Sequence, residues 1–315
     1  MPRAPALRRW GVPALVLAAF ALAPIGAAFG AEGYILSLLT RVMIFAIAAM
    51  SLDLILGYGA LVSFGHAAFL GIGAYAVGIL ASHGIEDGLL QLGLALGASA
   101  LFALVTGAIS LRTKGVYFIM ITLAFGQMLF FLATSLAAYG GDDGLTLPAR
   151  SRILGTGILE NQHVLYYAVL AFLAGAYLLC RAVVASRFGR VLRGARENPV
   201  RMQAIGFSPY PFQLAAYVLA GTLCGLAGFL LANQTEFVSP AYMTWQRSGE
   251  FIVVVILGGL ASLHGAIVGA AAFLLLEEVL SGYTEHWKMI FGPLLVLVVL
   301  FARGGILGLL GVRNG

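Results

Sequence analysis

Residues Ser186–Gly206 read SRFGRVLRGARENPVRMQAIG and form the only long polar, strongly basic segment between the hydrophobic runs of the chain. Apolar residues recur in it three or four positions apart, with arginines on another face, which predicts a short amphipathic helix. Asn198 and Pro199 are a start signal for a second short helix, and Gly206 is a stop signal. Such a pair of helices can pass force to a soluble subunit. A solvated basic loop facing anionic lipid heads is the alternative.

The composition of the 315-residue chain excludes a soluble globular protein. Hydrophobic residues make up 61% and charged residues 10%, whereas soluble domains carry about 25% charged residues. We predict one all-α polytopic membrane domain over residues 1–315, without a soluble appendage. The net charge of +5 then reflects membrane orientation and not a nucleic-acid surface. Cys180 and Cys224 both lie in apolar runs, which favours packing over a disulfide, and no metal-ligand spacing is present.

About ten apolar segments are candidate transmembrane spans. The first follows three arginines and has some features of a signal peptide, but another run follows at once, so we expect an uncleaved span. Segments 251–262 and 266–281 are shorter than the roughly 20 residues of a straight span and are expected to be broken, re-entrant or extended by flanking residues. The ten segments are 12–29, 34–56, 60–82, 89–111, 116–138, 164–184, 211–233, 251–262, 266–281 and 290–302.

The Lys and Arg residues predict the orientation of the chain. If all ten segments cross, 13 of the 18 basic residues fall on one side, which the positive-inside rule makes cytoplasmic. The N-terminus (1–11), a coupling loop (185–210) and the C-terminus (303–315) are then cytoplasmic, and residues 139–163 are a periplasmic loop. The cytoplasmic set is Arg3, Arg8, Arg9, Arg112, Lys114, Arg181, Arg187, Arg190, Arg193, Arg196, Arg201, Arg303 and Arg313.

Glycine clusters are a second feature of the chain. The stretch GYGALVSFGHAAFLGIGAY, Gly57–Tyr75, holds a serine and a histidine in mid-segment, which predicts a kinked or unwound helix. Close helix packing and lining of a transport pathway both explain such clusters. A second glycine cluster begins at Gly258. Each cluster begins with an Ile-Leu-Gly triplet, Ile55–Gly57 or Ile256–Gly258, which hints at an internal repeat. The candidate pathway or packing residues are Gly57, Gly59, Ser63, Gly65, His66, Gly71, Gly73, Gln127, Gly258 and Gly259.

A turn-rich acidic rim is predicted in the periplasmic loop, where glycines flank two aspartates. It is interpreted either as a contact for a binding protein at the pathway entrance or as a solvated turn. The rim residues are Gly140, Gly141, Asp142, Asp143 and Gly144.

No set of catalytic residues is found. The ionisable groups Asp53, Glu250, Glu277 and Glu278 each lie near a predicted span end, where they can reach the interface. A phosphate-binding G-x-x-x-x-G-K-[ST] loop, a serine hydrolase elbow and an H-E-x-x-H motif are absent from the sequence. We therefore expect a non-enzymatic chain, with any ATP hydrolysis on other chains and no cofactor in this one.

Four blocks of the sequence resemble the permease subunits of branched-chain amino acid ABC transporters. They are LGYGALVSFGHAAFLGIGAYAVGIL from Leu56, GVYFIMITLAFGQM from Gly115, GGDDGL from Gly140 and SRFGRVLRGARENPVRMQAIGF from Ser186. In that family the last block is the cytoplasmic loop that docks on the ATPase. The resemblance thus implies a second homologous permease, two ATPase chains that bind ATP and Mg, and a periplasmic binding protein. It also implies a multi-pass protein of the bacterial inner membrane with cytoplasmic termini.

The resemblance implies which residues couple to the ATPase. We expect two apolar side chains of the loop, Leu192 and Ile205, to fill a groove on the ATPase, with polar contacts around them. The coupling residues implied are Phe188, Leu192, Arg193, Arg196, Glu197, Asn198, Pro199, Ile205 and Gly206.

Two questions stay open at this point. Relatives of the same family carry urea, short amides or other amino acids, and these motifs do not separate the cargoes; Ala266 also stands where relatives usually have proline. The alternative from another class is a stand-alone secondary transporter or channel, which would need an intramembrane charged pair or ion site. The sequence shows no convincing one.

Overall fold

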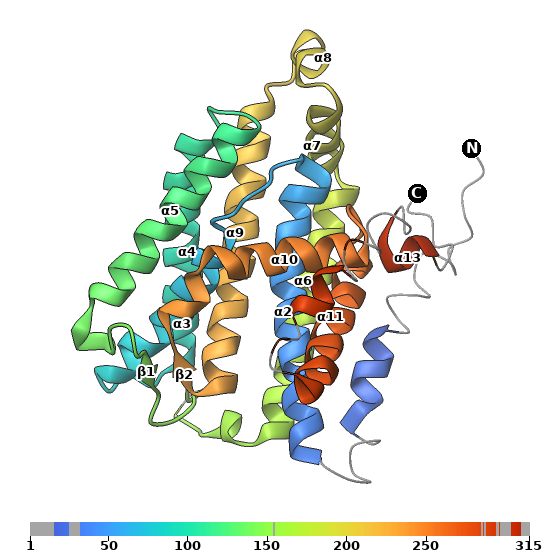
Figure 1. Cartoon of the computed structure of the whole chain (residues 1–315). Helices are drawn as coiled ribbons and strands as arrows, with labels where there is room; N and C mark the ends of the chain where they lie inside the picture. The colour runs from blue at the N-terminus through green and yellow to red at the C-terminus, as the bar shows by residue number, and fades with distance from the viewer. Residues whose placement is uncertain are drawn as a thin grey trace.

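Long apolar helices make up most of the chain in the computed structural model (Figure 1), which describes residues 16–24, 32–153, 155–284, 286, 288–293, 296 and 304–309. Residues 16–24 are helical. The elements that follow are α2 (Glu32–Gly59), α3 (His66–Ser82), α4 (Gly88–Ser110), α5 (Val116–Ser135), η1 (Ala137–Tyr139), β1 (Leu145–Thr146), η2 (Ile158–Glu160), α6 (Gln162–Ala185), α7 (Arg187–Glu197), α8 (Pro199–Ala204), α9 (Pro209–Thr235), β2 (Phe237–Val238), η3 (Pro240–Met243), α10 (Trp245–Gly258), α11 (Leu263–Tyr283) and α13 (Gly305–Leu309).

Six helices of the described residues, α2, α4, α5, α6, α9 and α11, are long and apolar enough to cross a membrane. The all-α polytopic fold is confirmed, but the predicted count of about ten spans is not. Helices α3 and α10 have 17 and 14 residues, which is short for a straight span. Helix α11 is longer than predicted, with 21 residues. The predicted segments 12–29 and 290–302 lie partly outside the described residues.

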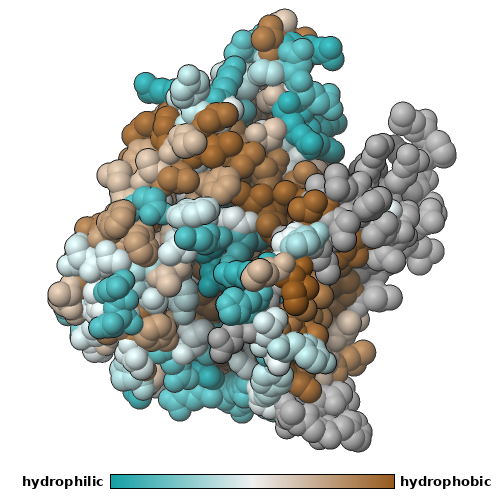
Figure 2. Space-filling model, viewed as in Figure 1, coloured by the Kyte–Doolittle hydropathy of each residue, from teal (hydrophilic) through white to brown (hydrophobic). Residues whose placement is uncertain are grey.

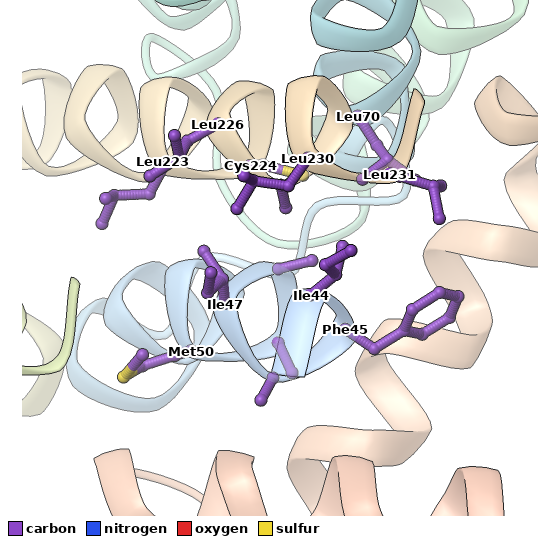
Figure 3. Close-up of a cluster of buried hydrophobic side chains, with 14 of the residues drawn as sticks. Ile44, Phe45, Ile47, Met50, Leu70, Leu223, Cys224, Leu226, Leu230 and Leu231 are labelled. Carbon is purple, nitrogen blue, oxygen red and sulfur yellow. The ribbon is translucent and has the colours of Figure 1, made fainter. Parts of the chain in front are cut away.

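Helices α2 and α9 form the centre of the bundle. In each of them 72% of the spanning window is buried, against 28% or less in α4, α5 and α6. Figure 3 shows Ile44 and Ile47 of α2 facing Leu223 and Leu230 of α9, with Leu70 of α3 beside them. Lipid tails are as apolar as these side chains, so close van der Waals packing, and not exclusion from water, holds the central helices together.

Glycines bring the backbones of neighbouring helices into contact. A Cβ atom at Gly73 of α3 would overlap the carbonyl oxygen of Gly225 in α9, and one at Gly228 of α9 would overlap that of Leu70. On its other side Gly225 lies against Ser99 of α4. Helix α9 is therefore wedged between α3 and α4 at a separation that only glycine allows.

The other candidate glycines also lie against neighbours, with one exception. A Cβ at Gly65 would overlap the carbonyl oxygen of Thr122 in α5, and one at Gly71 would overlap the side chain of Met243. Gly59 has room, because a Cβ there would meet nothing closer than 3.5 Å. The packing interpretation therefore explains Gly65, Gly71 and Gly73, and pathway lining by these glycines stays a prediction.

Two breaks interrupt the helices after the two Ile-Leu-Gly triplets. Helix α2 ends at Gly59 and α3 begins at His66, which confirms the unwound segment predicted there. Helix α10 ends at Gly258, and α11 begins four residues after the next glycine. Ala60 and Ala261, each five residues after the isoleucine of its triplet, both adopt positive φ, +55° and +59°. The sequence repeat thus marks two similar helix breaks.

Residues within the second break itself fix its shape. Gly259 has a φ of +116°, a conformation that residues with a side chain rarely adopt. Ser262 caps α11 by accepting a hydrogen bond from the Gly265 N–H at 3.1 Å. The Ala266 N–H donates to the Ser262 carbonyl at 3.0 Å, a helical bond that a proline at this position would lack.

The two ends of the bundle differ in structure. Helices α7 and α8 project at one end, and the short antiparallel pair β1–β2 lies at the other (Figure 1). Below the polar tip the surface seen in Figure 2 is largely apolar, and polar residues gather at its centre and lower end. Predicted cytoplasmic and periplasmic loops therefore lie at opposite ends, as a membrane-spanning arrangement requires.

We expect Gly65→Ala to destabilise the protein more than Gly59→Ala. The added methyl at Gly65 overlaps a backbone carbonyl, and overpacking of this kind costs about 1–3 kcal/mol, whereas the methyl at Gly59 has room. The fraction of detergent-purified protein that stays monodisperse after a heating series measures the difference. Equal loss in the two variants would contradict close packing at Gly65.

Candidate functional site

The predicted pair of short helices is confirmed as α7 and α8. Ser186 caps α7. Asn198 caps α8 by accepting a hydrogen bond from the Arg201 N–H at 2.9 Å, with Pro199 at the first helical position. Gly206 follows with a φ of +90°, a left-handed conformation typical of a glycine after a helix end. Local sequence signals thus set the start and end of the segment.

The apolar face of α7 packs inside this chain and not on a partner. Val191, Leu192 and Ala195 are buried, Leu192 completely, beside the end of α2. The half-buried Phe188 ring lies 5.6 Å from that of Phe212 in α9. The prediction that Leu192 fills a groove on an ATPase is therefore wrong, and Phe188 too packs mainly within the chain.

Two predicted coupling arginines bond inward. Arg193 Nη2 donates to the Val184 carbonyl of α6 at 3.3 Å, and Arg196 donates to the Gly57 carbonyl of α2. These bonds fix α7 to two spanning helices. A guanidinium has five N–H donors, so additional outward contacts by either arginine, or by the exposed Glu197, stay a prediction.

Helix α8 presents apolar side chains that no described residue covers. Val200 and Ile205 are 69% and 62% exposed, and Phe207 follows at 43%. They stand on the part of the molecule that projects beyond the bundle (Figure 1). A contact of these side chains with a partner protein stays a prediction. Ile205 is among the coupling residues predicted from the sequence. Val200 is not, because one valine between Pro199 and Arg201 gives no periodic signal.

A cleft of about 310 Å³ lies beneath these helices. Its walls come from α8, from the unwound segment after Gly59 and from the loop between α4 and α5, with Lys114 and Arg196 among its lining residues. Two loops that the charge count assigns to the cytoplasm thus meet at one end of the molecule.

The end of α2 connects the α7–α8 segment to the second helix break. The Asp53 Oδ1 atom accepts a hydrogen bond from the Ala261 N–H at 2.8 Å. Gly57 lies one turn later, and a Cβ atom there would overlap the Ala261 backbone. The Gly57 carbonyl also accepts the hydrogen bond from Arg196. We call these contacts of Asp53, Gly57, Arg196 and Ala261 the α2 junction. Gly258 packs beside it, against the Gly265 carbonyl.

The two polar residues of the first glycine cluster lie inside the bundle, and pathway lining by them stays a prediction. Ser63 and His66 are completely buried. His66 Nε2 lies 2.9 Å from Ser51 Oγ of α2, and the His66 carbonyl accepts from the Cys224 thiol of α9 at 3.5 Å. His66 thereby ties the start of α3 to the two central helices.

Gln127 differs from the other candidates because it lies on the outer side of α5. The residues that α5 buries, Phe118, Thr122 and Gly126, recur every four positions on the opposite side of the helix. The Gln127 amide makes no hydrogen bond with the residues that the structure describes. On the neighbouring α4 all polar side chains are buried and the exposed positions are apolar or glycine. The exposed side chains around it on α5, such as Met120, Met128 and Phe131, are apolar, so a pathway function for Gln127 stays a prediction.

The acidic rim at the other end is a turn fixed by glycines. Gly140, Gly141 and Gly144 all have positive φ, and the Gly144 N–H donates to the Gly140 carbonyl at 3.1 Å. Asp142 and Asp143 are exposed at the tip of the turn. The glycines are explained by backbone geometry alone, and the function of the two aspartates stays a prediction.

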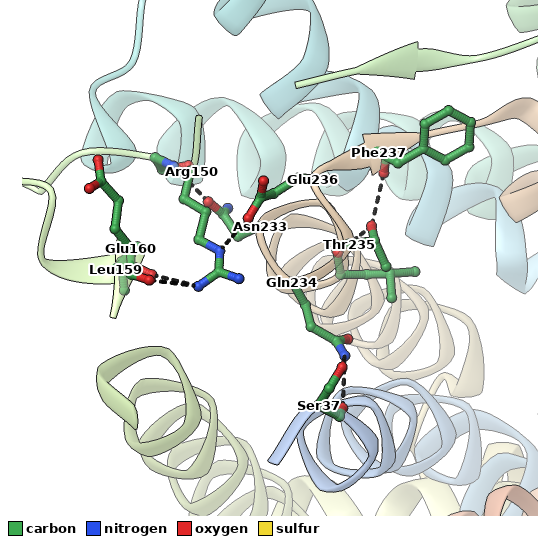
Figure 4. Close-up of polar contacts among 11 residues, drawn as sticks. Ser37, Arg150, Leu159, Glu160, Asn233, Gln234, Thr235, Glu236 and Phe237 are labelled. Carbon is green, nitrogen blue, oxygen red and sulfur yellow. Dashed lines mark hydrogen bonds and ion pairs between the residues drawn. The ribbon is translucent and has the colours of Figure 1, made fainter. Parts of the chain in front are cut away.

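Arg150 holds the rest of this loop against α9 (Figure 4). Its Nε lies 2.9 Å from Glu236 Oε1, and its Nη1 donates to the carbonyls of Leu159 and Glu160 at 3.0 and 3.2 Å. Asn233 accepts from a loop N–H beside it. The loop is therefore a structured platform at the end opposite α8.

Comparison with known proteins decides the family. Residues 34–300 match the family described as "Branched-chain amino acid transport system / permease component". The chain belongs to this family. The resemblance seen in the four sequence blocks is thereby confirmed, and a membrane permease, not an enzyme, is the family function.

Two family members are similar over most of the permease, and a third over less than half of it. The permease is 25% identical to the "High-affinity branched-chain amino acid transport system permease protein LivM" of Escherichia coli K12, over 88% of its own length and 71% of the relative's. The same protein of Salmonella typhimurium LT2 is 25% identical over 85% of this chain and 68% of the relative. The "Probable branched-chain amino acid transport permease protein LivH" of Methanocaldococcus jannaschii is 30% identical over 45% of this chain and 46% of the relative. No solved structure matches the permease significantly.

We expect the two ends of the permease to lie on opposite sides of the membrane. Arg201 of α8 and Asp142 of the rim are exposed, while the native Cys180 and Cys224 are buried and leave little background. A membrane-impermeant maleimide added to intact spheroplasts should label Asp142→Cys at once and Arg201→Cys only after permeabilisation. Labelling of both from one side would contradict the orientation.

Proposed function

We propose that this chain is one permease subunit of an ATP-driven importer of branched-chain amino acids, and that α8 docks on a cytoplasmic ATPase. The observation that carries the proposal is the projecting α8, with Val200 and Ile205 uncovered and α7 bonded to two spanning helices beneath it. A lipid-facing loop would not need a rigid attachment to α2. A docking lever does, because it must pass movement on.

The remaining partners follow from the family. The chain is similar both to proteins named LivM and to proteins named LivH, which supports a complex with a second, homologous permease. We propose two ATPase chains, which bind ATP and Mg, below α8. A periplasmic binding protein would deliver the amino acid at the rim of Asp142 and Asp143, at the opposite end.

The rival function is a secondary transporter acting alone. It requires charged groups within the membrane region, and the structure holds such groups on α2, α10 and α11, which the sequence had not brought together. The uncovered α8 favours the importer, because a solitary carrier has no soluble chain to dock. Transport without any ATPase would decide for the rival.

We expect Ile205→Asp to uncouple the importer while leaving the permease folded. The side chain is exposed, so a charge costs the isolated permease little, yet it would be desolvated in a groove of the ATPase. The matched variants are Arg190→Ala, which removes an exposed charge worth about 0–1 kcal/mol, and Leu192→Asp, which we expect to abolish folding because Leu192 is completely buried.

The measurement uses the permease purified with its partner permease, ATPases and binding protein. Co-elution with the ATPase, ATP hydrolysis stimulated by the leucine-loaded binding protein, and leucine uptake into liposomes are recorded for each variant. If Ile205→Asp keeps all three at the parent level, α8 is not the docking surface. If the permease alone imports leucine, the ABC assignment itself fails.

A further inference from the structure

A cluster of charged side chains joins α2, α10 and α11 on one side of the bundle. Arg41 Nη2 of α2 lies 3.5 Å from Glu277 Oε1 of α11. Arg247 Nη1 donates to Glu250 Oε2 at 2.6 Å within α10, and Lys288 Nζ lies 3.6 Å from the other oxygen of Glu250. Sequence analysis placed both glutamates at span ends and did not connect them with any arginine. We call these five residues the charged cluster.

The cluster is built around one aromatic ring. The guanidinium carbons of Arg41 and Arg247 lie 5.6 and 5.5 Å from the ring centroid of Phe45, which is itself buried and held edge-on by Phe251 at 5.6 Å. Glu277 also lies within electrostatic range of Arg247, Lys288 and Glu250. The two ion pairs therefore form one site with a fixed hydrophobic floor.

The cluster is positioned inside the spanning region, near the end opposite α8. Arg41 lies nine residues, or about 14 Å of helix, after the start of α2. It lies eighteen residues, or about 27 Å, before the end of α2. Helix α10 crosses in front of α2 and not along it (Figure 1), and a polar patch interrupts the apolar surface over its first half (Figure 2).

This side of the permease does not suit contact with lipid. The side chains of Arg41, Glu277, Arg247 and Glu250 are 21–34% exposed, and that of Lys288 is 70% exposed. Partly exposed charges within a membrane face a water-filled cavity or a protein partner, because hydrocarbon does not solvate them. The cluster therefore faces water or a protein partner, and both are expected where two permease subunits enclose a pathway.

The chemistry of the cluster matches a molecule with one carboxylate and one ammonium group. Among the described residues Arg41 makes one ion pair, at 3.5 Å, and Arg247 uses one of its five N–H donors on Glu250, so both keep donors for a carboxylate. Glu277 is 21% exposed, and its buried Oε2 atom has no hydrogen-bond partner among the described residues, so this carboxylate keeps acceptor capacity for an ammonium. Helix α10 begins beside Arg247 with no side-chain cap, and its positive end favours an anion.

We propose that the charged cluster is a binding site for the backbone groups of the transported amino acid, with the carboxylate at Arg41 and Arg247 and the ammonium at Glu277 and Glu250. The proposal rests on the import function proposed above and adds to it where the permease holds the cargo. Such a site recognises the zwitterion common to all α-amino acids, so choice among side chains would belong to other residues.

The first experiment tests recognition in the parent complex. Binding of radiolabelled L-leucine to the detergent-purified complex, without binding protein, is competed with L-valine, 4-methylpentanoate and isopentylamine. We expect competition by L-valine alone, because the other two compounds each lack one charged group. Competition by either analogue as strong as by L-valine, or no leucine binding at all, would overturn the proposal.

The second experiment separates binding from a structural role. Arg247→Gln and Glu277→Gln should lower ATP-driven leucine uptake into liposomes by about 10- to 100-fold, as expected for loss of a charge-assisted hydrogen bond. The exchanged pair Arg41→Glu with Glu277→Arg should recover thermal stability and assembly but not uptake. Arg152→Gln, which breaks the 3.0 Å pair with Glu86 outside the cluster, is the matched control and should leave uptake unchanged.

Recovery of uptake by the exchanged pair would show that the ion pair only holds α2 to α11, and the proposal would fall. Should the single variants not assemble, the competition on the parent complex decides. A parent complex that hydrolyses ATP but imports no branched-chain amino acid would instead refute the proposed function.

Discussion

Every backbone N–H and C=O group inside a membrane needs a partner within the protein, and this constraint shapes the two helix breaks of the permease. At the second break the Ala261 N–H is bonded to Asp53, and the Gly265 N–H to Ser262. At the start of α3 the Ala67 N–H is bonded to Ser248 of α10. Side chains far apart in the sequence therefore hold the breaks open, and the breaks hold α2, α3, α10 and α11 together.

The α7–α8 segment, proposed above to dock on the ATPase, is attached where these bonds converge. Arg196 of α7 donates to the Gly57 carbonyl, one turn from the Asp53 bond to Ala261. Helices α10 and α11, which join at that break, carry Arg247 and Glu277 of the charged cluster. Movement of α7 would thus reach the cluster through two packed helices and one short polar contact. The α2 junction is the physical link between the proposed ATPase and cargo sites.

Local signals in the sequence predicted the elements that depend on local chemistry. The caps and stop of α8 at Asn198, Pro199 and Gly206 came out as expected, because a capping side chain and a left-handed glycine act within a few residues. The unwound segment at Ser63 was predicted for a similar reason. The four sequence blocks also led to the family that the comparison then showed.

Features that depend on tertiary packing could not be predicted in this way. Periodicity places Leu192 on an apolar face of α7 but cannot say whether that face packs on its own chain or on a partner. The pairing of Arg41 with Glu277 joins helices from opposite ends of the sequence, and no spacing rule connects them. The short α10, which crosses α2 at an angle, likewise made a simple count of apolar runs unreliable.

The ratio of leucine imported to ATP hydrolysed tests the central claim most directly, because it separates docking from transmission. Arg196→Met removes the bond to Gly57 but keeps the length of the side chain, and Arg190→Met is the control on the exposed side of α7. In liposomes holding the complete importer, we predict that Arg196→Met keeps ATP hydrolysis and imports several-fold less leucine per ATP, because α7 loses its hydrogen bond to α2. A ratio equal to that of the parent and the control would contradict transmission through the α2 junction.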